Sequence, residues 1–319
     1  SMLPESTIAF ITMDTRKIGV MSCNPAIGGL GKGQIVREID ALGGLMGKAI
    51  DATGIMFKML NTSKGPAVWG PRAQADKDAY RDEIQRLIAT RSNIEVIEAT
   101  VDDLLVEDGE IKGVMLEEQL LAPAVVLTTG TFMRGLMHTG ELQEKGGRVG
   151  EGTAEGISGT LKRLGFELGR LKTGTPPRLS KKTIDWDSLP KQLGDEIPTP
   201  FSDCTDLESF PPLQQVDCRI THTTAEIHQL IKDNLDRAPM YSGAIDAESG
   251  PRYCPSIEDK VVRFADRTEH HVFLEPETLD GDSIYCNGIS TSLPRDIQEQ
   301  IIPIMPGCHH ATILQMGYA

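Results

Sequence analysis

The chain has 319 residues, of which 39% are hydrophobic and 24% charged, and its formal net charge is −14. These values fit one large or two medium globular domains, and no apolar run approaches the roughly 18 residues of a membrane span. An acidic chain is not expected to bind nucleic acid by itself, because neutralising phosphates requires clustered Lys and Arg. If it meets nucleic acid, we expect a local basic patch or a part outside this chain.

The N-terminus and the cysteines indicate the compartment. The opening Ser1-Met2-Leu3-Pro4 has neither the basic nor the apolar segment of a signal peptide, and the cysteines form no CxxC pair. We therefore expect a cytoplasmic protein with no membrane association, no metal site and no disulfide framework. Most of the cysteines are expected to be small core residues. They are Cys23, Cys204, Cys218, Cys254, Cys286 and Cys308.

The first third of the chain predicts a strand, a turn, helices and a meander. Residues 7–12 are apolar and β-rich, which predicts a buried strand of a parallel sheet. A glycine-rich stretch at residues 23–33 follows, and residues 34–42 predict a helix ended by Gly43-Gly44. A second, half-exposed helix is expected at residues 72–91. Short strands are expected at residues 94–97, 101–106, 111–116 and 124–128.

This order of elements is typical of the interior of a flavoprotein with two dinucleotide-binding domains. Asp108-Gly109 predicts a hairpin within the small antiparallel meander. Residues 172–220 are rich in Pro, Asp, Ser and Thr, and predict an inserted region with long loops. After it we expect a helix near residues 224–235, and strands near residues 261–264 and 271–274.

The glycine-rich stretch resembles a phosphate-binding loop, because it precedes a helix whose N-terminus favours anions. It does not match the Walker A pattern, since Ala26 replaces the first glycine and Gly33 replaces the Ser or Thr. Two interpretations remain: a tight structural loop, or a loop against a flavin, where glycine lets the backbone approach a flat ring. The second is favoured. The glycines concerned are Gly28, Gly29 and Gly31.

A dinucleotide fingerprint is missing from its expected place. It should precede the strand at residues 7–12 by one strand and one helix, yet only six residues come before that strand. Either the fold is different or the first βα unit lies outside this chain. A strand ending in Thr129-Gly130 is typical of flavoproteins, although strands that end in glycine are common.

The densest motif is residues 250–264, where a turn precedes a cysteine held between an aromatic residue and a proline. One interpretation is a capped loop, with Ser256 as N-cap and Asp259 at the box position. The other is a reactive Cys254 whose thiolate is favoured by two basic neighbours. These neighbours are Arg252 and Lys260.

Basic residues also gather between residues 162 and 182. Their arrangement fits a solvated face, or a local phosphate patch on an otherwise acidic chain. The set is Lys162, Arg163, Arg170, Lys172, Arg178, Lys181 and Lys182.

Five stretches together resemble the glucose-inhibited division protein A family. The stretches are residues 21–29, 64–68, 72–76, 169–178 and 250–264. The resemblance covers essentially the whole chain, and motifs of this length are highly specific. It implies a cytoplasmic, homodimeric enzyme that uses FAD and NADH and works with a GTPase partner protein on the wobble uridine of tRNA. It adds a carboxymethylaminomethyl group at C5, with methylenetetrahydrofolate as the one-carbon donor and glycine or ammonium as the amine.

The same resemblance implies site residues. Cys23 and Cys254 match two family cysteines proposed to help catalysis, as nucleophiles toward the uracil ring. Val101 matches a position that contacts FAD, on a strand after the helix at residues 72–91. The segment that matches the family's nicotinamide-binding motif consists of Gly250, Pro251, Arg252, Tyr253, Cys254, Pro255, Ser256, Ile257, Glu258, Asp259, Lys260, Val261, Val262, Arg263 and Phe264.

The resemblance also predicts a fragment. Family members begin with a strand and a phosphate loop, and continue into the second half of the flavin domain and a helical domain that binds tRNA. We therefore predict an α/β, Rossmann-like, two-dinucleotide-binding fold that is incomplete. Residues 1–176 form a partial FAD-binding domain with a β-meander near residues 94–128, and residues 177–319 form an inserted α+β, NAD-binding region.

Two other functions remain open. The first is a folate- and FAD-dependent tRNA uracil methyltransferase, which shares fold and chemistry but is expected to lack the motif at residues 250–264 and the long insertion. The second is a non-catalytic module that binds a nucleotide or a partner. Flavin absorbance separates the enzymes from the module, and product analysis of tRNA separates the two enzymes.

Overall fold

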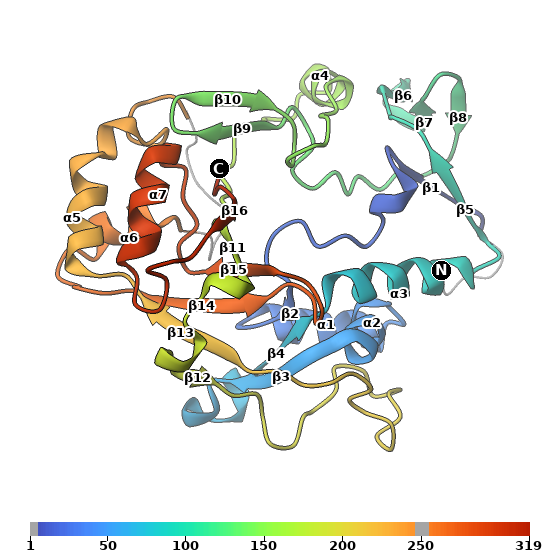
Figure 1. Cartoon of the computed structure of the whole chain (residues 1–319). Helices are drawn as coiled ribbons and strands as arrows, with labels where there is room; N and C mark the ends of the chain where they lie inside the picture. Colours follow the sequence, from blue (N-terminus) through green and yellow to red (C-terminus); the bar gives the residue numbers. More distant parts are fainter. Residues whose placement is uncertain (1–5, 246–254) are drawn as a thin grey trace.

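The computed structural model describes residues 6–245 and 255–319. A six-stranded sheet with three helices on one side lies next to a three-stranded sheet with helices of its own, and smaller β units lie beyond them (Figure 1). Two hydrophobic cores lie within these two main units. The fold therefore contains both parallel and antiparallel pairings and belongs to the α/β class.

The six-stranded sheet has the order β12-β13-β14-β15-β11-β16, and all of its pairings are antiparallel. Its strands are β11 (Arg178–Ser180), β12 (Lys191–Gln192), β13 (Cys218–His222), β14 (His271–Pro276), β15 (Ser283–Asn287) and β16 (Ile313–Gln315). The helices packed against it are α5 (Ala225–Asp233), α6 (Ile257–Arg263) and α7 (Arg295–Ile304). Apolar residues at helical spacing, such as Ile227 and Ile231, pack against inward-facing strand residues, such as Leu274.

The three-stranded sheet has the order β2-β4-β3. Its strands are β2 (Ala26–Gly28), β3 (Gly54–Leu60) and β4 (Gly70–Ala75). The helices beside it are α1 (Lys32–Ala41), α2 (Met46–Thr53) and α3 (Lys77–Ala89). Phe57 and Phe201 are fully buried in this core, so the long loop that carries Phe201 is part of the packing.

The smaller β units lie around the upper and right parts of Figure 1. Strand β1 (Ile8–Thr12) pairs in parallel with β5 (Ile94–Glu98). The others are the meander β6 (Asp103–Glu107), β7 (Glu110–Met115) and β8 (Gln119–Leu121), the hairpin β9 (Leu136–Thr139) and β10 (Leu142–Lys145), and helix α4 (Gly156–Arg163). No helix in the described ranges is long and apolar enough to cross a membrane.

Several local predictions are confirmed. Asp108 and Gly109 both have positive φ between β6 and β7, as a tight hairpin turn requires. Helix α1 ends where expected, with Gly43 at φ 83° and hydrogen bonds from the Gly43 and Gly44 amides to the last turn. The inserted region does contain a long loop, residues 193–217, with no helix or strand.

Other predictions are wrong, and pairing or capping explains each one. The helix expected at residues 72–91 begins at Lys77, because residues 70–75 are the central strand of a sheet and Asp76 caps the helix. The strand expected at residues 261–264 is the end of helix α6, which covers residues up to Arg263 and has Phe264 as its C-cap. Residues 124–128 form no strand, and Val126 is 84% exposed. Strand β1 is parallel as expected but not buried, since in the described part of the chain it pairs only with β5.

Candidate functional site

Cys23 lies where the two main units of the fold meet. It precedes β2 of the three-stranded sheet, and its Sγ lies 3.1 Å from Oη of Tyr285 on β15 of the six-stranded sheet. Its second contact is the carbonyl oxygen of Gly174, 3.8 Å from Sγ. The side chain is half-buried, so the sulfur has ordered neighbours and remains accessible. Three described cysteines, Cys218, Cys286 and Cys308, are core residues as expected, whereas Cys204 is exposed.

The ring of Tyr285 packs against the guanidinium group of Arg178, which is itself held in place. The guanidinium carbon of Arg178 lies 4.8 Å from the centre of the Tyr285 ring, within the range of a cation–π contact. Arg178 is itself held, because it donates hydrogen bonds to Thr175 and to the Pro176 carbonyl oxygen. Burial, and then the neighbouring Cys23, raises the pKa of Tyr285 well above its ordinary value, so the phenol keeps its proton.

Two ion pairs join the two main units: one links strand β4 to strand β14, and the other links the start of α3 to the residue after β14. Arg72 on β4 donates a hydrogen bond of 2.7 Å to Glu275 on β14, and Lys77 donates one of 2.8 Å to Glu277. Glu275 is almost completely buried, and burial raises its pKa, although Arg72 acts in the opposite direction. These contacts fix the register of one sheet against the other, and therefore the approach of Cys23 to Tyr285.

The glycine loop after Cys23 contains glycines of two kinds. A Cβ on Gly28 would lie 2.2 Å from the Pro71 carbonyl oxygen and 2.8 Å from Cζ of Phe201, so this glycine permits close packing. Gly29 and Gly31 have φ of 103° and 73°, and apart from each glycine and its two chain neighbours, no heavy atom of the described part lies within 4 Å of where their Cβ would be. The bare backbone at these two positions therefore fits the close approach of a flat ring, while Gly28 has a structural role.

Gly28→Ala is expected to reduce the free energy of unfolding by about 2 kcal/mol more than Gly29→Ala. Both variants place alanine at positive φ, which costs roughly 1 kcal/mol, but only the first also forces a methyl group against a backbone oxygen. Urea unfolding of the two variants in parallel measures the difference. Equal losses would mean that the backbone conformation, and not the contact with Pro71, selects glycine at residue 28.

The motif at residues 250–264 is described from Pro255 onward, so Gly250 to Cys254 lie outside the described residues. The interpretation as a capped structure is confirmed: the Ser256 hydroxyl accepts from the Asp259 amide, and the Asp259 carboxylate accepts from the Ser256 amide. Most side chains of α6 face the interior of the protein. The exposed residues in the described part of the motif are Pro255, Val262, Arg263 and Phe264.

Basic side chains near this motif are engaged within the protein. Lys260 donates to the Gly288 carbonyl oxygen at 2.8 Å, and burial lowers its pKa. Lys172 is buried, and its Nζ lies 3.6 Å from an Asp259 oxygen. Burial by itself would raise the pKa of Asp259, but the charge of Lys172 and the hydrogen bonds with Ser256 outweigh this effect and lower the pKa. Since Lys172 and Arg178 are both buried, the basic residues between 162 and 182 do not form one phosphate patch.

Val101 lies between β5 and β6, and not on a strand as expected. The segment from Thr100 to Asp102 makes the turn from the parallel pair into the meander, and the Asp102 amide donates to the Met115 carbonyl oxygen. The strand of the meander begins one residue later, at Asp103, because the first ladder pairing is Asp103 with Met115. The side chain of Val101 is half-buried.

A histidine pair packs behind α6. His228 on α5 and His270 before β14 stack with ring centres 5.1 Å apart. The Thr223 hydroxyl accepts from the His270 amide and lies 2.7 Å from Nε2 of His228, to which its own proton can be donated. A hydrogen bond donated by the Thr223 hydroxyl requires that Nε2 of His228 carry no proton. Burial lowers the pKa of both rings, and for His270 the charges of His228, Lys260 and Arg267 add to the effect.

We expect thermal stability to fall as the pH falls below about 6.5. The unfolded histidines bind protons near that pH, whereas the folded ones have lower pKa values, so acid favours the unfolded chain. Melting temperatures between about pH 7.5 and about pH 5.5 check this expectation. His228→Gln should reduce the decline, and His310→Gln, at an exposed position, should leave it unchanged. An identical decline in all three proteins would assign the pH dependence to other groups.

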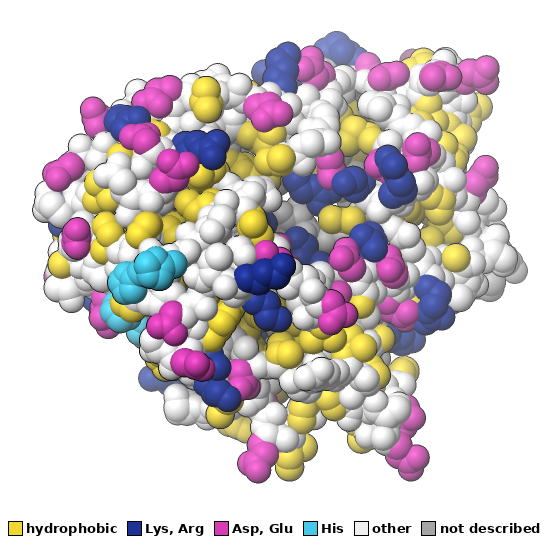
Figure 2. All heavy atoms as spheres, viewed as in Figure 1, with side chains coloured by type: hydrophobic (Ala, Val, Ile, Leu, Met, Phe, Trp, Pro, Cys, Tyr) yellow, Lys and Arg dark blue, Asp and Glu magenta, His cyan; other side chains and the backbone are white. Residues whose placement is uncertain are grey.

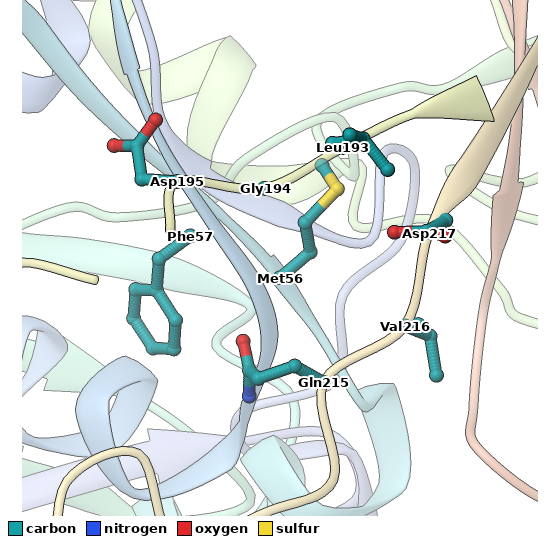
Figure 3. A pocket seen from close by; sticks show the side chains of 8 residues that line it. All are labelled: Met56, Phe57, Leu193, Gly194, Asp195, Gln215, Val216 and Asp217. Atoms are coloured by element: carbon teal, nitrogen blue, oxygen red, sulfur yellow. The ribbon is translucent and has the colours of Figure 1, made fainter. Parts of the chain in front are cut away.

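A separate pocket of about 170 Å³ opens beside β3 (Figure 3). Its polar groups already have partners: Asp195 accepts from the Met59 amide, Gln215 donates to the Gly54 carbonyl oxygen, and Asp217 pairs with Lys191. Met56 extends toward Leu193 across it (Figure 3). The pocket lies between two loop segments, around Asp195 and Val216, that each hydrogen-bond to the backbone of β3. The Cys23 region is therefore the better candidate for a reactive site.

Basic side chains surround a hollow near the centre of the face in Figure 2. In the loop after β10, Arg148 and Glu151 form an ion pair, and Glu151 also pairs with Lys17 at 3.3 Å. Arg148 lies near enough to Tyr318 for its charge to affect that phenol, and so does Cys23. Near Tyr318 and Cys23, two cations, Arg148 and Lys17, therefore share the single carboxylate of Glu151.

Sequence reasoning missed most of the residues that make up the surroundings of Cys23. Arg178 was noticed only as one of a basic set, and Tyr285, Tyr318 and Glu275 were not singled out. Tyr285 lies 262 residues from Cys23 along the chain, and no local pattern links the two. The isolated polar residues of β14 and β15, within otherwise apolar strands, were the one available signal.

Comparisons with known proteins agree along the whole chain. A sequence model of the family described as "Glucose inhibited division protein A" matches residues 5–319. The chain is 55% identical over 98% of its length to the "tRNA uridine 5-carboxymethylaminomethyl modification enzyme MnmG" of Rhodopirellula baltica, and 54% identical to the enzyme of the same name from Granulibacter bethesdensis. It covers 49% and 50% of those relatives.

Solved structures show the same relation. The structure of Aquifex aeolicus GidA in the form II crystal superposes with a TM-score of 0.88 at 45% identity, covering 97% of this chain and 50% of that one. The form I crystal gives a TM-score of 0.89 at 46% identity, with 97% and 52% covered. The chain thus spans about half the length of the relatives it matches.

Proposed function

Because the chain belongs to the glucose inhibited division protein A family, we propose that it is part of an enzyme that modifies uridine in tRNA. The intact enzyme would add a carboxymethylaminomethyl group at C5 of the wobble uridine. It would act in the cytoplasm as a homodimer, together with a GTPase partner and with methylenetetrahydrofolate as the one-carbon donor. The observation that carries the proposal is the 55% identity to an enzyme of that name over 98% of this chain.

FAD would supply the redox chemistry of this reaction, and NADH would reduce it. The incomplete Rossmann-like architecture proposed for residues 1–176 would hold the flavin, with the bare backbone at Gly29 and Gly31 against the ring. Val101 would contact the FAD from the side of the β6–β8 meander. NADH would meet the inserted region, residues 177–319, through the exposed side chains around α6 and the part of the motif that precedes it.

Cys23 would act on the uracil ring. A thiolate that adds to C6 places an electron pair at C5, which then attacks the one-carbon unit; loss of the C5 proton and departure of the sulfur restore the ring. The half-buried sulfur beside Tyr285 suits this role, since it is ordered but accessible. Cys254 would be the second cysteine of the reaction.

The test is a comparison of this chain with a version extended at both ends as in the relatives. An absorption spectrum after gel filtration with FAD reports flavin binding, and mass spectrometry of tRNA nucleosides reports the product in cells that lack the enzyme. We expect the extended protein to retain flavin and to restore the carboxymethylaminomethyl nucleoside. A 5-methyluridine product would favour the methyltransferase, and a colourless extended protein would favour a non-catalytic module.

A further inference from the structure

The sulfur of Cys23 has two polar neighbours that differ in kind. The Gly174 carbonyl oxygen, at 3.8 Å, can only accept a hydrogen bond, so it suits the neutral S–H group. The Tyr285 hydroxyl, at 3.1 Å, can donate or accept. When the thiol proton leaves to solvent, the sulfur becomes an acceptor only, and of these two neighbours the phenol alone can then stabilise it.

We infer that Tyr285 donates a hydrogen bond to the Cys23 thiolate and so is a positioning residue for that sulfur. This inference rests on the role proposed above for Cys23. It assigns to β15, in the C-terminal half of the chain, a direct effect on the reactivity of a residue next to β2. Because the phenol is buried while the sulfur is half-buried, the bond would approach the sulfur from the inside and leave its outer side open to a reacting carbon.

Arg178 strengthens the donor. Its cation lies against the Tyr285 ring at 4.8 Å and draws electron density from it, which makes the hydroxyl a better donor. The cation cannot swing toward the sulfur, because its guanidinium is bonded to Thr175 and Pro176 and lies 3.5 Å from Glu277. Burial also keeps the pKa of Tyr285 above its ordinary value, so the phenol still carries its proton at a pH where a thiol ionises.

The test is the pH–rate profile for alkylation of Cys23 by iodoacetamide, read from the modified peptide by mass spectrometry. In Tyr285→Phe we expect the midpoint of the profile to rise by about one pH unit, and the rate below the midpoint to fall roughly tenfold. Cys204, which is exposed, provides a reference rate within each sample. Tyr80→Phe removes another buried phenol oxygen, on α3, and should leave the Cys23 profile unchanged.

An unchanged or lower midpoint in a folded Tyr285→Phe protein would overturn the inference. If that variant does not fold, 3-fluorotyrosine at residue 285 keeps the shape of the ring and makes the hydroxyl a stronger donor, so the midpoint should move down; no movement again overturns it. The assay needs neither tRNA nor flavin. If Cys23→Ser in the extended protein still modifies tRNA, the catalytic role of Cys23 fails while the alkylation result stands.

Discussion

Arg72→Met is expected to lower the free energy of unfolding by about 3–5 kcal/mol. The guanidinium of Arg72 is 2.7 Å from Glu275, whose side chain is only 2% exposed, so the substitution leaves a carboxylate buried without its cation. Among the described residues, only Asn287 would still donate to that carboxylate, at 3.1 Å. Chemical unfolding followed by circular dichroism measures the loss. The matched control is Arg81→Met on α3, whose carboxylate partners are exposed; it should change stability by roughly 0.5 kcal/mol or less.

A second substitution and a change of pH identify the cause. Arg72→Met combined with Glu275→Leu should recover most of the loss, because removing both charges ends the desolvation penalty. Burial already raises the pKa of Glu275, so its carboxyl group binds a proton more tightly in the folded protein than in the unfolded chain. The loss in Arg72→Met should therefore be smaller near pH 5 than near pH 8. A loss that is independent of pH and persists in the double variant would point to packing.

Asp51→Asn is expected to cost about 3 kcal/mol. The carboxylate of Asp51, on α2, accepts hydrogen bonds from the Phe201 amide at 2.7 Å, the Ser202 amide at 2.8 Å and the Thr205 hydroxyl at 2.6 Å. An asparagine can accept at one oxygen, but its NH₂ group would face a donor. Phe201 packs against Gly28, so the loosened loop should also reach the glycine loop. Urea unfolding, together with limited proteolysis in residues 193–217, measures both effects.

The control for Asp51 is its neighbour Asp40 on α1. Burial raises the pKa of Asp51 most, the three hydrogen bonds oppose that, and the charge of Asp40 raises it further. Asp40→Asn removes the repulsion and should be neutral or slightly stabilising. If Asp40→Asn and Asp51→Asn cost the same, the anchoring of residues 200–205 on α2 is not what stabilises this part of the fold.

Capping and turn residues were sufficient signals for several elements. Ser256 and Asp259 form the capping box that begins α6, Gly43 ends α1, and Asp108-Gly109 turns the hairpin, all through bonds between residues near in sequence. The β-rich segment at residues 7–12 was correctly expected to pair in parallel. The family was also readable from the sequence, because long motifs are specific, and the comparisons confirm it.

Whether a segment is buried, and whether it pairs with another strand, depended on residues elsewhere in the chain. Residues 72–75 have a helical pattern but form a strand, because β2 and β3 both pair with them. Residues 124–128 have the pattern of a buried strand but have no partner strand among the described residues, and a lone strand cannot satisfy its backbone hydrogen bonds. Val126 is consequently exposed.

The sequence by itself determined the Asp108-Gly109 turn, the end of α1, the start of α6, the acidic balance and the family, since each depends on residues close together or on the identity of whole motifs. The tertiary structure alone decided what surrounds Cys23. Tyr285 and Gly174 reach it from other segments, and Arg178 packs against the Tyr285 ring, because the two main units are joined by ion pairs at Glu275 and Glu277. Contacts across 151 and 262 residues follow from how the sheets pack, and no local pattern encodes that packing.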